Sequence, residues 1–278
     1  MVSRMVEQKH TLEKITALWL FPFITLIVAS TTGGLLSTAL VTNSVTFAVL
    51  TALFSLTMLI IGLSLAFMII TIYLVRLVIY GLPEKSLGLS AFVVLGPLGQ
   101  GGWSLLINGQ NLSKLLPLYN PSPSNFPDIA AAGQMTFWLC FCGAYILWSM
   151  GVCWIIISSY TIFGVLRKEG CPPFSITYHG LIFPIAVYAL LSVQLGNVLD
   201  SAFFHGFGAA WTGQDNSHDM VLFESSSFPV VVAFILWLSI FARTILAVVD
   251  RSIFVAPDII LVHDNITVKI LHANFLSM

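Results

Sequence analysis

Charged side chains are scarce in this chain of 278 residues: Asp, Glu, Lys and Arg together make up only 8%, about a third of their share in soluble domains. Hydrophobic residues make up 58%. A water-soluble fold would lack the polar residues to cover itself, so the composition predicts an integral membrane protein. Eleven basic and twelve acidic residues give a net charge of -1. That balance leaves no basic surface for a nucleic-acid backbone, and we expect no nucleic-acid partner.

Metal-binding and catalytic patterns are also lacking. The four cysteines, Cys140, Cys142, Cys153 and Cys171, have none of the C-x-x-C spacings of zinc or redox sites, and we interpret them as core thiols. The sequence contains no P-loop, H-E-x-x-H or G-x-S-x-G signature. We therefore expect no metal, no cofactor and no enzymatic activity.

Long apolar segments are what the chain does contain. A helix needs about 20 apolar residues to cross the hydrocarbon core of a bilayer. Six segments qualify, at 15–40, 45–79, 86–110, 130–166, 175–204 and 227–249. We predict an all-α integral membrane protein with a six-helix transmembrane domain at 13–250, a cytoplasmic segment at 1–12 and a cytoplasmic tail at 251–278. The tail carries no capped helix or turn signal, so we expect it to be disordered or to lie along the membrane surface.

The connecting segments predict the orientation. Placing the N-terminus inside puts nearly all Lys and Arg residues at cytoplasmic ends and leaves Lys114 alone in an outer loop. We expect a multi-pass protein of the plasma membrane with both termini in the cytoplasm. Asn111 begins an N-x-S triplet and is a candidate glycosylation site in that outer loop.

The six segments alternate in character. The first, third and fifth contain a proline and small polar residues, whereas the others have no internal proline. Pro22, Pro97 and Pro184 are spaced like a threefold helical-hairpin repeat. A proline frees a backbone carbonyl that lipid cannot bind, so we expect the interrupted helices to gather around a central path and the smooth ones to face lipid. The alternative is that small residues and prolines serve helix packing alone.

The predicted path is neutral. No charged residue lies in the interior of the three interrupted segments, which argues against a carboxylate-driven antiporter. Hydroxyls, amides and freed backbone groups would replace part of an ion's hydration shell. We predict that the path is lined by Pro22, Ser30, Thr31, Thr32, Gly96, Pro97, Gln100, Pro184, Ser192 and Gln194.

These segments carry a family resemblance. The run Gly96-Pro97-Leu98-Gly99-Gln100-Gly101-Gly102, together with Trp19 to Pro22, Phe183-Pro184 and Gln194 to Gly196, resembles the tellurite-resistance/dicarboxylate transporter family. Its fungal sulfite efflux pumps are the most similar branch, and slow-type anion channels share the fold. The resemblance implies helical hairpins around a central pore, ten helices in all, and homo-oligomers, commonly trimers. It covers about 12–250 and corresponds to the fifth through tenth helices, so the first four are absent here.

The resemblance also implies a gate and a substrate. In the channel relatives a phenylalanine before the proline of the ninth helix occludes the pore, and Phe183 holds that position. The alternative is that Phe183 only packs between helices. We expect efflux of sulfite or bisulfite. A C4-dicarboxylate (malate) permease would need a fixed cation that the predicted pore helices lack, and a non-transporting, truncated membrane protein is the remaining alternative.

Overall fold

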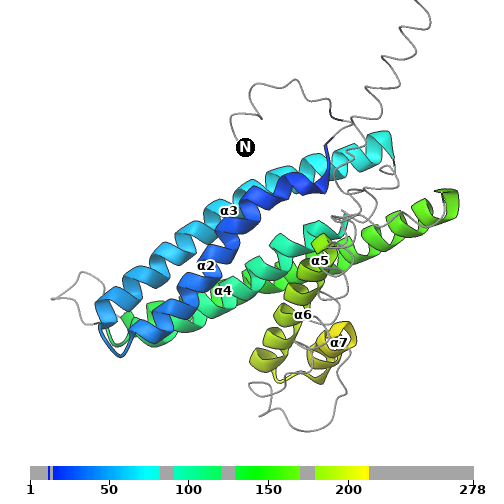
Figure 1. Ribbon diagram of the computed structural model, residues 1–278. Helices are drawn as coiled ribbons and strands as arrows, with labels where there is room; N and C mark the ends of the chain where they lie inside the picture. Colours follow the sequence, from blue (N-terminus) through cyan, green and yellow to red (C-terminus); the bar gives the residue numbers. More distant parts are fainter. Residues whose placement is uncertain (1–11, 13–14, 82–90, 120–128, 170–178, 213–278) are drawn as a thin grey trace, which may run out of the picture.

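The computed structural model describes residues 12, 15–81, 91–119, 129–169 and 179–212 (Figure 1). All regular secondary structure in this part of the chain is helical, which confirms the all-α prediction. The elements are the 3-10 helix η2 (Ala17–Leu20) and the α-helices α2 (Phe21–Leu40), α3 (Val45–Tyr80), α4 (Leu95–Leu115), α5 (Ile129–Glu169), α6 (His179–Leu199) and α7 (Ala202–Thr212).

The helix boundaries agree with the predicted segments at the first, second and fourth positions. The third helix differs, because α4 begins at Leu95 rather than 86 and continues to Leu115. The fifth predicted segment is divided into α6 and α7 at Asp200, whose φ of 48° interrupts the helix. The sixth predicted helix at 227–249 and the tail at 251–278 lie outside the described residues, as does nearly all of the segment at 1–12.

The three proline-bearing helices run parallel to one another. Near the start of α4, a Cβ built on Gly96 would lie 3.5 Å from Ile24 Cδ1 in α2 and 3.7 Å from Pro184 Cγ in α6. Near the end of α4, Asn111 bonds Ser37 of α2. Since early residues meet early residues and late meet late, α2, α4 and α6 share one direction.

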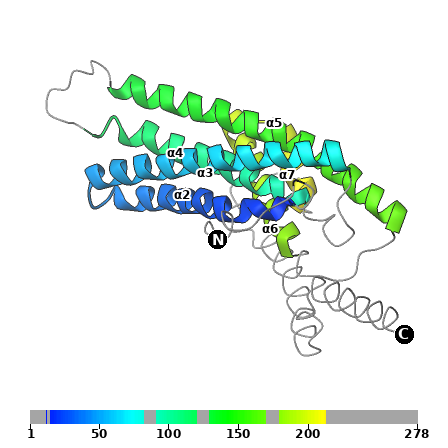
Figure 2. The same ribbon diagram turned by 90° about the horizontal axis from the view of Figure 1, so that it is seen from above.

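The smooth helices α3 and α5 run against that direction. On α3, the later Gly62 lies against the earlier Ile27 of α2, whereas the earlier Ser55 lies against the later Gly33 of α2. On α5, Gly143 lies against Leu105 of α4 and the earlier Gly133 against the later Ser113. Figures 1 and 2 show α2 and α3 side by side along their lengths. Helices α2 and α3, and α4 and α5, therefore form two antiparallel hairpins; the second helix of the third predicted hairpin lies outside the described residues.

Helix α4 lies at the centre, and its glycines explain how. Every residue at 91–102 is buried. A Cβ on Gly99 would lie 2.7 Å from the backbone nitrogen of Tyr188 in α6, and one on Gly101 would lie 2.7 Å from Leu63 in α3. Gly109 faces α5 in the same way, because a Cβ there would lie 2.7 Å from Cys140 Cβ. The glycines thus let several helices approach one central helix.

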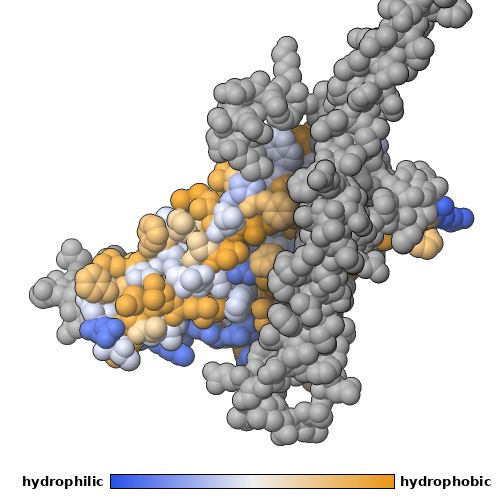
Figure 3. Space-filling view, in the orientation of Figure 1, coloured by the Kyte–Doolittle hydropathy of each residue, from blue (hydrophilic) through white to orange (hydrophobic). Residues whose placement is uncertain are grey.

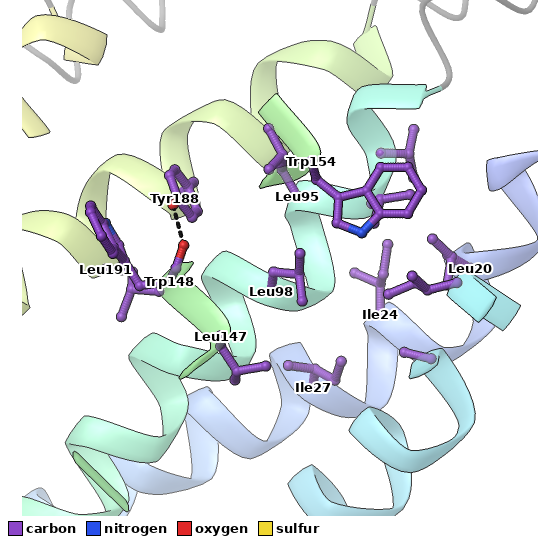
Figure 4. Packing of buried hydrophobic residues seen from close by; sticks show 14 of the residues in the cluster. Leu20, Ile24, Ile27, Leu95, Leu98, Leu147, Trp148, Trp154, Tyr188 and Leu191 are labelled. Atoms are coloured by element: carbon purple, nitrogen blue, oxygen red, sulfur yellow. Dashed lines mark hydrogen bonds between the residues drawn. The ribbon is translucent and has the colours of Figure 1, made fainter. Parts of the chain in front are cut away.

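Apolar side chains fill the spaces between these helices. In Figure 4, Leu98 of α4 stands between Ile24 and Ile27 of α2 on one side and the pair Trp148 and Tyr188 on the other. The Tyr188 hydroxyl donates to the backbone oxygen of Trp148, which joins α6 to α5. Helix α7 closes this end of the core through Phe204, whose ring lies 4.9 Å from that of Trp148.

The outer surface is apolar, as a bilayer requires. Among the described residues, most of the exposed large apolar side chains belong to α3 and α5, whereas α4 has none. Figure 3 shows such residues spread over the visible surface of the hairpin formed by α2 and α3. Four helical stretches are long and apolar enough to cross a membrane: Ala17–Leu40, Val45–Tyr80, Ala131–Gly164 and Ile182–Leu199. Helix α4 is not among them, since its glycines and amides lower its hydropathy and protein rather than lipid surrounds it.

Two sequence-based interpretations need correction. Cys140 is buried, but Cys142 and Cys153 are exposed on α5, so they are not core thiols; Cys171 lies outside the described residues. An apolar thiol on a lipid-facing helix carries no solvation penalty, so composition could not tell these positions from a core.

The second correction concerns the prolines. Pro22 is the second residue of α2, and Pro97 is the third residue of α4. In the first turn of a helix the backbone N–H groups have no intrahelical partner, so proline there marks a helix start rather than a break. Both helices follow a 3-10 turn, η2 and residues 91–94. Of the three prolines, only Pro184 lies inside its helix, so only α6 has the expected mid-helix proline.

Candidate functional site

One face of α4 lies between its contacts with α2 and α6. Gly96, Trp103, Ile107, Gln110 and Lys114 fall within roughly 60° of one another on a helix of 3.6 residues per turn. Gln100 and Ser104, which contact α2, lie to one side of this sector, and Gly99 and Gly102, which contact α6, lie to the other. Within the sector, Ile107 packs against Gly34 of α2. We call these five residues the open face of α4.

Exposure along the open face is greatest at its end. Gly96 and Ile107 are buried, Trp103 and Gln110 are half-buried and Lys114 is exposed. Lys114 is the basic residue of the last turn of α4 and carries the only charge on this face. The open face thus runs from a closed, apolar start to a polar, positively charged end.

A matching face of α6 borders it. Phe183, Ala186, Leu190, Gln194 and Asn197 recur every three or four residues, so they lie on one side of α6, and none of them is buried. Gln194 Nε2 approaches Gln110 Oε1 at 3.4 Å. The two faces therefore meet along the same line of the molecule.

The three parallel helices meet at Gly96. A Cβ placed there would be 3.5 Å from Ile24 Cδ1, 3.7 Å from Pro184 Cγ and 3.8 Å from Phe183 Cε1. Phe183 is 39% exposed, so its ring is neither packed into the core nor free of it. The predicted residues Gly96, Pro184 and Phe183 are brought together here, each from a helix start or a proline turn.

A second group of predicted residues gathers between α2 and α4. Gln100 Nε2 donates to Thr31 Oγ1 at 2.8 Å, and the hydroxyls of Ser30 and Ser104 lie 2.9 Å apart. Asn108 Nδ2 donates to the Ser104 backbone oxygen at 2.9 Å. All five side chains are buried. We call Ser30, Thr31, Gln100, Ser104 and Asn108 the polar seam; its hydroxyls and amides hydrogen-bond one another, so they join helices.

The remaining predicted lining residues are dispersed. Thr32 is exposed on α2 and donates to the Val28 backbone oxygen at 3.1 Å. Ser192 is buried on the α5 side, where it accepts from Trp148 Nε1 at 2.9 Å. Pro22 is half-buried, and Pro97 is buried. Their lining role stays a prediction.

Asn111 lies inside α4 rather than in a loop. Its amide nitrogen donates to the Gly34 backbone oxygen at 2.6 Å and to Ser37 Oγ at 2.9 Å. Thr38 Oγ1 donates to its amide oxygen at 3.0 Å. A side chain held by α2 in this way is poorly placed for glycosylation, which stays a prediction.

Sequence reasoning missed most of the open face. Trp103, Ile107 and Gln110 were not singled out, and Lys114 was assigned to a loop. The available signal was helical spacing from Gly96, since these residues recur seven, eleven, fourteen and eighteen positions later. Among the described residues, no group of three or more His, Cys, Asp or Glu side chains could hold a metal ion.

Comparison with known proteins gives a family match and several similar proteins. The sequence matches the family model SLAC1: Voltage-dependent anion channel over residues 1–248. A protein of Arthroderma otae described as sulfite efflux pump SSU1 is 29% identical over 259 residues, which cover 91% of this chain and 60% of that protein. The protein of the same description from Trichophyton rubrum is 28% identical with the same coverage. The one from Candida albicans is 35% identical over 104 residues, 37% of this chain and 21% of that protein.

The chain is shorter than the relatives that it matches. The chain spans about 60% of the length of the first two relatives. No solved structure matches the chain.

Proposed function

Because the chain belongs to the voltage-dependent anion channel family, we propose that it acts in the membrane export of sulfite or bisulfite. The anion would move along the open face of α4 and pass Phe183. The relatives described as sulfite efflux pumps support this choice of substrate. The proposal assigns no catalytic residue and no enzymatic step.

The observation that carries the proposal is the convergence at Gly96. Three parallel helices contribute Ile24, Gly96 and the Phe183-Pro184 pair within contact distance. A large apolar ring beside a glycine can close a narrow conduit by excluding water, and a side-chain rotation can open it. We therefore propose Phe183 as the gate.

The same region favours an anion over a cation. The α-helical parts of α2 and α4 both begin at this level, at Phe21 and Leu95. The N-terminal end of a helix carries a partial positive charge. No carboxylate lies on the open face of α4, and its one charged residue, Lys114, is basic.

The membrane setting follows from the surface of α3 and α5. Their exposed apolar side chains would face lipid, with α2, α4 and α6 behind them. We propose that the protein is a multi-pass component of the plasma membrane with its N-terminus in the cytoplasm. We also propose that it works as a homo-oligomer, a trimer by family resemblance.

The test is sulfite tolerance in a host that lacks its own exporter. Expression of the full chain should restore growth on sulfite and lower intracellular sulfite. Malate uptake without tolerance would replace the proposal with a dicarboxylate permease. Correct membrane insertion with neither activity would favour a non-transporting protein.

A further inference from the structure

The end of the open face remote from Phe183 brings together polar groups that the gate does not use. Gln110 and Gln194 are half-buried and face each other across α4 and α6 at 3.4 Å. That separation is longer than a good amide hydrogen bond, so the pair is weakly joined. Each amide nitrogen therefore has N–H groups available for another acceptor.

A cation stands next to this amide pair. Lys114 follows Gln110 by four residues, one turn further along the same face of α4. It is exposed and has no ion-pair partner among the described residues. Its flexible four-carbon stem can bring the ammonium over the Gln110 and Gln194 amides.

This set of groups matches a small oxyanion. The two amide NH2 groups and the ammonium can each donate hydrogen bonds to an anion. Sulfite offers three acceptor oxygens on one small centre. A halide would use the charge but only part of the donor set. Lys114 is exposed at the end of α4 and the two amides are only half-buried, so binding there would be weak enough to allow release.

We propose that Lys114, Gln110 and Gln194 form a docking site for a small oxyanion of the sulfite class. The inference rests on the proposed export function and adds a second station on the same route. Gln110 and Lys114 are fourteen and eighteen residues from Gly96, so the site lies roughly 21–27 Å along α4 from the gate. The docking site and the gate therefore lie near opposite sides of the hydrocarbon core.

Equilibrium binding tests the site without requiring transport. The purified full chain in detergent is titrated with sodium sulfite by calorimetry, with sodium chloride of equal ionic strength as the comparison salt. We expect Lys114→Gln to weaken sulfite binding about fivefold, as for loss of one exposed charge interaction. Gln194→Leu should weaken it as well, and Lys114→Arg should keep most of it.

The matched control removes the same charge elsewhere. Arg167 is exposed near the end of α5, at the opposite end of the bundle from Lys114. Arg167→Gln should leave sulfite binding unchanged. Equal binding constants for Lys114→Gln and Arg167→Gln would overturn the docking site, and so would a parent protein that binds no sulfite.

Sided transport separates this inference from the proposed function. With sulfite supplied on one side at a time, Lys114→Gln should raise the half-saturating concentration only from the Lys114 side. Lys114-dependent binding without any transport would leave the docking site standing and refute the export function. Transport that is insensitive to Lys114→Gln from both sides would refute the docking site and leave the export function standing.

Discussion

Phe183 is the residue on which the proposed gating depends. Its ring lies against Gly96 with 39% of its surface exposed, so removing it would open space where the three parallel helices meet. We expect Phe183→Ala to raise anion current several-fold in membranes that contain the full chain. Phe163→Ala is the control, because Phe163 is an exposed phenylalanine on α5. An unchanged current in Phe183→Ala would make Phe183 a packing residue.

Gly99 is the tightest backbone contact of α4. A Cβ there would lie 2.7 Å from the nitrogen and 2.8 Å from the Cα of Tyr188, and backbone atoms cannot move aside cheaply. We expect Gly99→Ala to destabilise the protein by about 1–3 kcal/mol, the usual cost of overpacking. The measurement is the thermal unfolding midpoint of the protein in detergent.

The control for Gly99 is a glycine with room beside it. At Gly143 the added carbon would meet only Leu105 Cδ1, at 3.1 Å, which is the end of a flexible side chain. Alanine also has the higher helix propensity, by about 1 kcal/mol. Gly143→Ala should therefore unfold within about 1 kcal/mol of the parent. Equal losses in both variants would show that neither contact is special.

For single residues, the sequence identified the polar positions better than the direction in which their side chains point. It selected Ser30, Thr31 and Gln100 as polar groups of membrane helices, and all three lie in the polar seam, where Gln100 bonds Thr31 and Ser30 bonds Ser104. Polarity alone does not reveal how far a helix is rotated about its axis. The neighbours of Gly99 and Gly101 were equally beyond prediction, because they depend on which helices lie alongside.

At the level of elements, the hairpin repeat was predictable and the helix starts were not. Apolar residues continue through 91–94 into α4, so nothing in the pattern separates a 3-10 turn from an α-helix there. Pro22 and Pro97 therefore suggested breaks although they begin helices. The division at Asp200 was missed although Asp200 and Ser201 interrupt the apolar run, because apolar residues resume at Ala202.

The polar seam joins two elements, and a double-mutant cycle can measure its strength. Ser30 and Ser104 lie 2.9 Å apart between α2 and α4. Ser30→Ala and Ser104→Ala should show a coupling energy of about 0.6 kcal/mol, and no more than about 1.7 kcal/mol, as for interhelical hydrogen bonds in other membrane proteins. Denaturant unfolding of the two single variants and the double variant provides the values.

Two serines that bond only within their own helices provide the comparison cycle. Ser64 donates to the backbone of its own helix α3, at Ile60, and Ser149 is bonded within α5, at Tyr145. Ser64→Ala and Ser149→Ala should be additive. A coupling in the seam no larger than in this pair would mean that the seam does not hold α2 to α4.

For the whole molecule, the apolar surface of α5 has a measurable consequence. Cys142 and Cys153 are exposed on the protein, but a bilayer would cover them. We expect both to resist a membrane-impermeant maleimide in intact membranes, because the reaction needs a thiolate in water. Lys114→Cys, in a Cys171→Ser background, should react readily.

The same labelling measures orientation. Helices α4 and α5 run in opposite directions, so Lys114 and Arg167 lie at opposite ends of the hairpin. Lys114→Cys and Arg167→Cys should therefore label from opposite sides of the membrane. Labelling of both from one side would contradict the spanning arrangement, and rapid labelling of Cys153 would contradict lipid cover.

The enclosure of α4 also bears on how the chain is made. With glycines and amides through its length, α4 is too polar to leave the translocation channel for lipid by itself, whereas α5 is among the stretches apolar enough to do so. Helix α4 has extensive contact with α5. The two helices would therefore enter the bilayer together as one hairpin. During synthesis, α4 must then wait until α5 has emerged from the ribosome.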